Sequence, residues 1–91
     1  MLSNDLSIGQ VVKNISGRDS GRLFFIIKIV NEKSVYISDG KKRKLEKPKL
    51  KKVKHLQKYG IINCEVKNKI ELNESITNAF IRAELGKLNN V

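Results

Sequence analysis

The order of apolar and polar residues predicts a series of short strands in the first two thirds of the chain. Three segments are rich in β-branched or aromatic residues and end at turn residues, as strands do; they are residues 8–15, 23–30 and 35–38. The run LFFIIKIV at 23–30 is short for a helix and lies between turn signals, which favours a largely buried strand. Apolar positions of the first segment are Val11, Val12 and Ile15.

Polar and glycine-containing segments separate these strands. SGRDSGR at 16–22 contains Gly17 and Gly21 and predicts a turn, and NEKS at 31–34 predicts a hairpin loop. Asp39-Gly40 is a dipeptide typical of tight turns. We therefore expect the chain to reverse at Asp39-Gly40 and the next residues to form a return strand.

Apolar residues continue at intervals through the following, mostly polar segment. We expect these residues to anchor it in the core; they are Leu45, Leu50, Val53 and Leu56. Pro48 interrupts strand pairing, KLKK at 49–52 fits a single helical turn, and residues 53–57 fit a short extended piece. Five short strands within residues 8–60 predict a mainly β fold, a small five-stranded barrel or sandwich.

The C-terminal third, residues 61–91, has a different pattern and is predicted to be an extension of the barrel. Apolar and polar residues alternate over 61–72, which predicts a strand. A helix is predicted at about 74–86, with Asn73 as N-cap and Gly86 at its end.

The predicted helix has two apolar faces. One face carries Ile76, Ala79, Phe80 and Ala83, and the other carries Ile81, Leu85 and Leu88. We expect one face to pack on the barrel. The face with Ile81, Leu85 and Leu88 is then either a contact for a protein partner or part of a helix buried on both sides.

Neither a secretion signal nor a membrane span is predicted. Residues 1–7 are short and polar and are expected to be flexible, without a basic region followed by an apolar one. The longest apolar run, Leu23 to Ile27, has five residues, whereas a span needs about 20. With a single cysteine, Cys64, no internal disulfide can form. We expect a cytoplasmic protein without a membrane partner.

Charge is concentrated in one segment. The chain has a net charge of +10, and the 18 residues from Lys41 to Lys58 hold ten basic residues and one acid. Fifteen of the 19 basic residues are Lys, but a general bias toward Lys would not cluster them. The clustering predicts a polyanionic partner, most simply nucleic acid, over the alternative of a merely solvated basic face.

A surface dominated by Lys favours recognition of the phosphate backbone and of RNA shape over readout of base edges. The candidate RNA-binding residues in the basic segment are Lys41, Lys42, Arg43, Lys44, Lys47, Lys49, Lys51, Lys52, Lys54 and His55. In the first turn, Arg18 and Arg22 flank two glycines that let the backbone approach a phosphate, and both are further candidates. Gly17, Gly21, Asp39 and Gly40 are expected to shape the turns.

Catalytic chemistry is not indicated. The single histidine and single cysteine lie nine positions apart, and neither metal-ligand spacing nor a glycine-rich phosphate loop is present. We therefore expect a protein that is not an enzyme and has no catalytic residues, metal site or cofactor.

The segment GQVVKNISGRDSGRLFFIIKIV resembles a KOW motif, from about Val11 to about Ile37. Gly21 matches the glycine that the motif requires, and Gly17 the one that often precedes it. The continuation ISDGKKRKLEKPKLKKVKHLQ resembles bacterial KOW-domain RNA-binding proteins related to the L-fourteen-e ribosomal protein family. The sequence departs from the motif at Ser20, where many members carry Lys.

This resemblance covers residues 8–58 and implies an SH3-like barrel, RNA binding without catalysis, and, for ribosomal members, a place on the large ribosomal subunit. Ribosomal RNA is then the expected partner. Two alternatives remain at this stage. One is a KOW module of the kind found in NusG-type transcription elongation factors, and the other is a protein-interaction module that uses the apolar helix.

Overall fold

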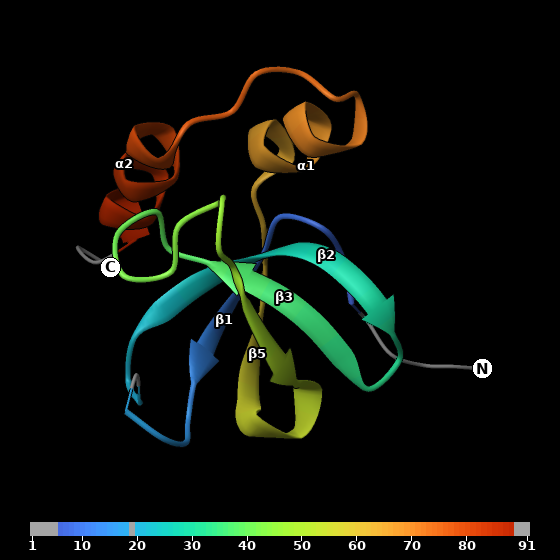
Figure 1. The fold of residues 1–91 in the computed structure, drawn as a ribbon, viewed down its shortest axis with the longest axis vertical. Helices are drawn as coiled ribbons and strands as arrows, with labels where there is room; N and C mark the ends of the chain where they lie inside the picture. Colours follow the sequence, from blue (N-terminus) through green and yellow to red (C-terminus); the bar gives the residue numbers. More distant parts are fainter. Residues whose placement is uncertain (1–5, 19, 89–91) are drawn as a thin grey trace.

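A computed structural model describes residues 6–18 and 20–88 of the chain. Five strands precede two helices (Figure 1). In chain order the elements are β1 (Gln10–Asn14), β2 (Leu23–Asn31), β3 (Ser34–Ser38), β4 (Lys49–Lys52), the 3-10 helix η1 (Val53–His55), β5 (Leu56–Ile62), α1 (Cys64–Glu71) and α2 (Asn78–Leu88).

The strands form one antiparallel sheet in the order β4-β3-β2-β1-β5. Its longest strand, β2, pairs with both β1 and β3, so that Phe25 lies between Val11 and Ser38. The two edge strands, β4 and β5, are joined only by the three residues of η1, which requires the sheet to curl until its edges meet. The expected mainly β, five-stranded barrel-like fold is confirmed.

Two apolar clusters lie on opposite sides of the β1–β2 pair. The first fills the barrel and consists of Val12, Phe24, Ile26, Val35, Ile37 and Leu56. The second lies between the outer face of the sheet and the helices, and its buried members are Val11, Phe25, Val66, Ile81 and Leu85. Neighbouring residues such as Phe24 and Phe25 therefore both enter a core, since successive side chains of a strand point to opposite faces. This explains why residues 24–26 show no alternation. The run at 23–30 is not largely buried as expected, because its end projects beyond the two clusters and leaves Ile29 and Val30 exposed.

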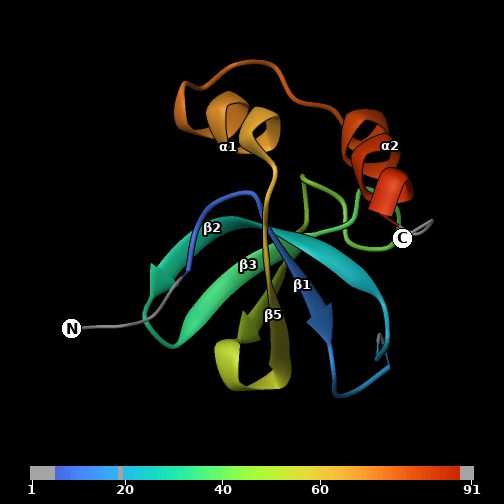
Figure 2. The ribbon, with the colours of Figure 1, turned by 180° about the vertical axis from the view of Figure 1, so that it is seen from behind.

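Both helices lie on the same side of the barrel, as the two opposite views show (Figures 1 and 2). The predicted strand over 61–72 is wrong, because β5 ends at Ile62 and α1 begins at Cys64. Asn63 caps α1 by accepting a hydrogen bond from the N–H of Val66 at 3.0 Å. Val66 and Ile70 are four positions apart, which places them on one face of a strand and equally on one face of a helix. In the structure, the two side chains contact the second cluster from one face of α1.

The predicted start of the second helix is also wrong. Asn73 has φ of +56° and follows the end of α1, where the N–H of Glu74 donates to the Lys69 carbonyl at 2.8 Å. A left-handed residue in this position closes a helix, and asparagine adopts this conformation more readily than most residues. The helix α2 begins at Asn78 after Thr77, whose hydroxyl accepts from the N–H of Phe80 at 3.1 Å. Gly86 lies inside α2.

The face of α2 with Ile81, Leu85 and Leu88 packs on the barrel. Ile81 and Leu85 are buried in the second cluster, and Leu88 is partly buried against it. The expectation that these residues are available to a protein partner is therefore wrong. On the other predicted face, Ala79 and Ala83 are exposed.

Three local predictions in the basic segment also fail. No return strand follows Gly40, because residues 39–48 form a loop and pairing resumes only at Lys49. KLKK at 49–52 is the strand β4, and the helical turn is η1 instead. Of the four predicted anchors, Leu50 is 51% exposed and lies outside the core, whereas Leu56 is buried and Val53 and Leu45 are partly buried.

The segment 1–7 was predicted to be flexible, and residues 1–5 of it lie outside the described residues. Leu6 is partly buried against the barrel core, and the N–H of Ser7 donates to Gln10 Oε1 at 3.0 Å. Within residues 6–18 and 20–88, neither helix is long and apolar enough to cross a membrane.

Candidate nucleic-acid interface

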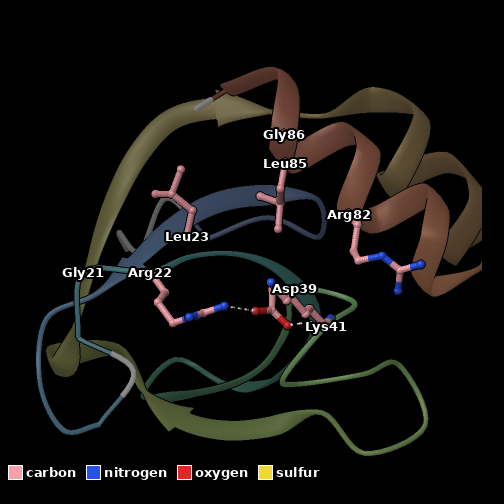
Figure 3. Close-up of a pocket in the computed structure, with 8 residues that line it drawn as sticks. All are labelled: Gly21, Arg22, Leu23, Asp39, Lys41, Arg82, Leu85 and Gly86. Atoms are coloured by element: carbon pink, nitrogen blue, oxygen red, sulfur yellow. Dashed lines mark hydrogen bonds and ion pairs between the residues drawn. The ribbon is translucent and has the colours of Figure 1, made fainter. Parts of the chain in front are cut away.

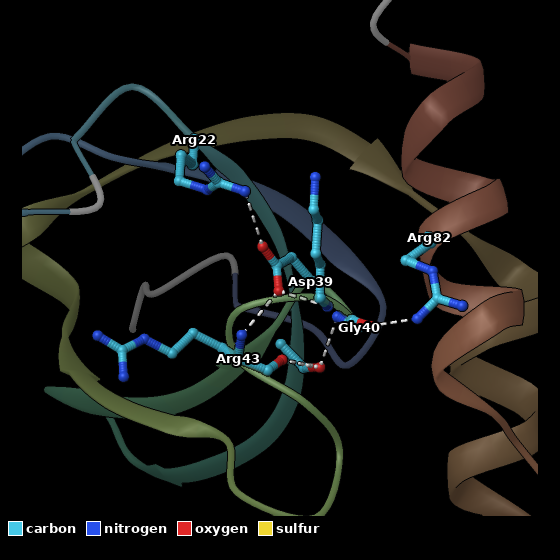
Figure 4. A network of polar contacts seen from close by, with 7 residues as sticks. Arg22, Asp39, Gly40, Arg43 and Arg82 are labelled. Carbon is cyan, nitrogen blue, oxygen red and sulfur yellow. Dashed lines mark hydrogen bonds and ion pairs between the residues drawn. The ribbon is translucent and has the colours of Figure 1, made fainter.

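The basic segment begins with a small closed turn over residues 38–43. Asp39 is 7% exposed at its side chain, and its Oδ1 accepts hydrogen bonds from the N–H groups of Lys41 and Arg43, each at 2.9 Å. The Ser38 hydroxyl donates to the Arg43 carbonyl at 2.6 Å. Figure 4 shows this turn between Arg22 and α2. These bonds hold the backbone of Lys41 and Lys42 in one shape while both residues stay exposed.

Helix α2 fixes the loop from two positions. Arg82 Nη1 donates to the Gly40 carbonyl at 2.7 Å (Figure 4). Asn78 Oδ1 accepts from the N–H of Leu45 at 2.8 Å, and Asn78 Nδ2 donates to Glu46 Oε1 at 2.7 Å. The Asn78 amide thereby lowers the pKa of Glu46 below its ordinary value. A loop that carries a row of like charges is thus tied at both ends to a packed helix.

Strand β4 continues the basic segment at the edge of the sheet. Its four residues pair with β3, and Lys49 and Lys51 lie opposite the buried residues Ile37 and Val35. These two lysines are partly buried, whereas Leu50 and Lys52 between and after them are exposed. Because side chains alternate across a strand, the lysines of β4 are divided between two faces.

The turn between β1 and β2 meets the basic segment at one end of the barrel. Lys51 Nζ lies 3.4 Å from the carbonyl of Ser16, and the N–H of Ile15 donates to the His55 carbonyl at 3.0 Å. Gly17 and Gly21 have φ of +83° and +88°, a region that favours glycine. Arg18 is exposed beside Gly17, and Asp19 lies outside the described residues.

No protein-family model matches the chain. The chain is 33% identical over 73 residues to a protein of Bacillus subtilis (strain 168) named "Putative ribosome-binding protein YbzG". The aligned region covers 80% of this chain and 99% of the relative. The chain belongs to the YbzG family.

In this member of the YbzG family, the predicted RNA-binding residues fall into three neighbouring groups. The groups are the first turn with Arg18 and Arg22, the loop with Lys41, Lys42, Arg43, Lys44 and Lys47, and the edge segment with Lys49, Lys51, Lys52, Lys54 and His55. We call these residues together the basic surface. The side chains of Arg43 and His55, like those of Arg22, Lys49 and Lys51, are partly buried, and the others are exposed.

The structure joins some of these groups through side-chain contacts. Arg22 Nη2 lies 3.6 Å from Asp39 Oδ2, which connects the first turn to the basic loop, and Lys51 connects the first turn to β4. Arg82 and Asn78 of α2 also reach the loop, although neither was among the predicted RNA-binding residues. Their contacts span 33 to 42 positions of the chain, and no local pattern in the sequence marks them.

Within the described part of the chain, no three His, Cys, Asp or Glu side chains come together as a metal site would require. Cys64 is exposed and not part of a disulfide.

Proposed function

We propose that the chain associates with the ribosome by binding ribosomal RNA, without catalysis, through the basic surface. The observation that carries the proposal is that nine units of the net charge of +10 lie in 18 consecutive residues, Lys41 to Lys58. These residues do not form a tail: the loop is tied to α2 and the following strand is paired to β3. An ordered array of cations presents its charges to a phosphate backbone at a lower entropic cost than a mobile one.

Two further observations support the proposal. The relative YbzG carries a name that describes ribosome binding. The resemblance to a KOW motif agrees in position with the structure, because Gly21 lies in the turn between β1 and β2 with φ of +88°. We propose that residues 11–37 form such a motif and that the fold is an SH3-like barrel of the KOW type.

Affinity for RNA should come mainly from lysine–phosphate contacts and should therefore fall steeply with salt. About five such contacts predict a slope near −3.5 in a plot of log K against log salt concentration for single-stranded RNA. The measurement is a titration of a labelled ribosomal RNA fragment by fluorescence anisotropy at several salt concentrations. A slope near zero would contradict the proposal.

A pair of double variants tests whether the basic surface is responsible for RNA binding. Lys42→Gln with Lys44→Gln removes two exposed charges of the loop, whereas Lys28→Gln with Lys33→Gln removes two exposed charges of the β2–β3 hairpin. If both loop lysines contact phosphates, the first variant should reduce the steepness of the slope by about 1.4 units for single-stranded RNA, and the second should leave it unchanged. Equal effects of the two variants would show only a general effect of net charge.

Co-sedimentation tests the ribosomal partner separately from RNA binding. The protein should sediment with isolated large ribosomal subunits at low salt and be released as the salt concentration rises. RNA binding without sedimentation with ribosomal subunits would leave the RNA-binding part of the proposal intact and overturn the ribosomal part. Association with RNA polymerase in place of the ribosome would favour the transcription-factor alternative.

A further inference from the structure

A cleft lies between the barrel and α2, beside the basic loop (Figure 3). It has a volume of about 300 Å³ and is lined by three segments that are far apart in the sequence. The start of β2 supplies Gly21, Arg22 and Leu23, the turn supplies Asp39 and Lys41, and α2 supplies Arg82, Leu85 and Gly86. Cavities that hold small molecules begin at about this size.

The lining of the cleft is positively charged. It contains three cationic side chains, Arg22, Lys41 and Arg82, and one acid, Asp39. Two backbone N–H groups already occupy Asp39 Oδ1, and Arg22 lies beside Asp39 Oδ2 (Figure 3). The carboxylate is therefore compensated within the protein, and the cleft as a whole attracts an anion.

Donor groups remain for an incoming anion. The Arg82 guanidinium has five N–H donors, and among the described residues its only hydrogen bond is that to the Gly40 carbonyl. Arg22 is 38% exposed at its side chain and holds Asp39 at a distance too long for a strong hydrogen bond. Among the residues that the structure describes, the Lys41 ammonium makes no ion pair or hydrogen bond.

The rest of the lining is apolar or has no side chain. Leu23 and Leu85 line the cleft from the sheet and from α2 (Figure 3). Gly86 leaves the cleft open next to Leu85, and a Cβ atom placed on it would meet no atom within 4 Å. An apolar surface next to several cations suits a ligand with a flat, partly apolar ring and a phosphate, which is the chemistry of a nucleotide.

A second hollow of about 370 Å³ adjoins the cleft and shares Gly21 and Leu23 with it. Its remaining lining includes Lys13, Tyr59 and Ile61. A ligand that extends from the cleft along the first turn would therefore meet another cation and an aromatic ring. This continuity favours a nucleotide that belongs to a chain over a free mononucleotide.

We propose that this cleft receives one nucleotide of the bound RNA. Its phosphate lies among Arg22, Lys41 and Arg82, and its base or sugar packs on Leu23 and Leu85 beside Gly86. This inference rests on the proposed RNA-binding function. It adds a defined nucleotide site to a surface that otherwise recognises only the backbone, and it gives α2 a direct part in binding.

The first test uses adenosine 5′-monophosphate and follows backbone amide signals of the ¹⁵N-labelled protein by NMR. The nucleotide should shift the amide signals of Gly21, Leu23, Lys41 and Gly86, and inorganic phosphate or adenosine alone should shift them less at the same concentration. Shifts confined to other parts of the molecule, or equal shifts with phosphate alone, would overturn the nucleotide site.

The second test adds a side chain at Gly86, which lines the cleft. Gly86→Leu places a side chain in open space within a helix and should keep the fold, because Leu is a much better helix former than Gly. Ala83→Leu introduces the same side chain at an exposed position of α2 outside the cleft and is the matched control. Gly86→Leu should weaken binding of adenosine monophosphate and of a six-nucleotide RNA by about fivefold or more, whereas Ala83→Leu should change neither.

Lys41→Gln gives a second variant that leaves the cleft open but removes one cation. It should also weaken binding of adenosine monophosphate, while the NMR spectrum far from the turn stays unchanged. Loss of mononucleotide binding in Gly86→Leu with unchanged affinity for the six-nucleotide RNA would assign the cleft to a free nucleotide and overturn the inference. If the unmodified protein binds RNA in a salt-dependent way and neither variant changes that binding, the nucleotide site in the cleft is overturned and the proposed function stands. If the unmodified protein does not bind RNA, the proposed function itself is overturned.

Discussion

At the residue scale, single backbone conformations determine how the basic loop meets α2. Gly40 has φ of +73°, and a Cβ atom at this position would collide with the carbonyl oxygen of Asn78 and press against Ile81. Gly21 has a similar φ of +88°, but its surroundings are open. Both glycines adopt the left-handed backbone conformation that disfavours a side chain. At Gly40, the missing side chain also leaves room for α2 to pack closely against the turn.

The comparison of Gly21→Ala with Gly40→Ala separates these two effects. Gly21→Ala should reduce the free energy of unfolding by about 1–2 kcal/mol, the cost of a side chain in the left-handed region. Gly40→Ala should cost about 1–3 kcal/mol more, because extra atoms are forced into a packed site. Chemical denaturation of both variants measures the difference, and equal losses would show that the contact with α2 does not constrain Gly40.

At the element scale, α2 is the support of the basic loop as well as a cover for the sheet. One of its faces is buried through Ile81 and Leu85, and Asn78 and Arg82 hold the loop. The loop itself contributes few apolar contacts, with Leu45 only partly buried in the second cluster. Beyond the turn held by Ser38 and Asp39, the shape of the loop therefore depends on the hydrogen bonds from α2.

Asn78→Ala should loosen the loop without removing a charge. We expect faster hydrogen exchange at the amide of Leu45 and a loss of about 1 kcal/mol in the free energy of unfolding. RNA affinity should also fall, because binding must then order the loop. Asn68→Ala, at an exposed position of α1, is the control. Unchanged exchange at Leu45 in Asn78→Ala would show that the loop is ordered by other contacts.

At the scale of the whole molecule, the second cluster joins the outer face of the sheet to both helices, and a polar link joins the helices to each other. Glu84 of α2 accepts hydrogen bonds from Lys87 Nζ and from Asn63 Nδ2, each at 2.8 Å. Asn63 is also the N-cap of α1. The carboxylate of Glu84 therefore helps to hold α1 and α2 together. Its hydrogen bonds to Lys87 and to Asn63 lower the pKa of Glu84 below its ordinary value of 4.5.

This link predicts a dependence of stability on pH. Because the pKa of Glu84 is lower in the folded state, its stabilisation is fully present above pH 4.5 and is lost as the pH falls from there toward the folded-state pKa. Glu84→Gln should lower stability at pH 7 and reduce the loss between pH 5 and pH 3, values of about the range in which Glu titrates. Thermal unfolding across this range tests it, with Glu71→Gln at an exposed position as the control. An unchanged pH profile in Glu84→Gln would contradict the role of this carboxylate.

The sequence by itself determined the features that depend on neighbouring residues. Short segments of β-branched and aromatic residues specified three of the strands, and the run at 23–30 was correctly expected to be a strand, although it is buried only over residues 24–26. The concentration of charge in residues 41–58 is also visible without a structure. These features follow from local preference and from composition, and a short window of the chain contains all the information that they need.

Only the tertiary structure decided the features that depend on distant partners. The spacing of Val66 and Ile70 fits two periodicities, and packing against the second cluster selects the helix. Both apolar faces of α2 are plausible from the sequence, and packing against Val11 and Phe25 of the sheet buries Ile81 and Leu85. The loop at 39–48 is fixed against α2 by Asn78 and Arg82, more than 30 positions away. The free energy of such contacts is gained only when the folded barrel brings the segments together.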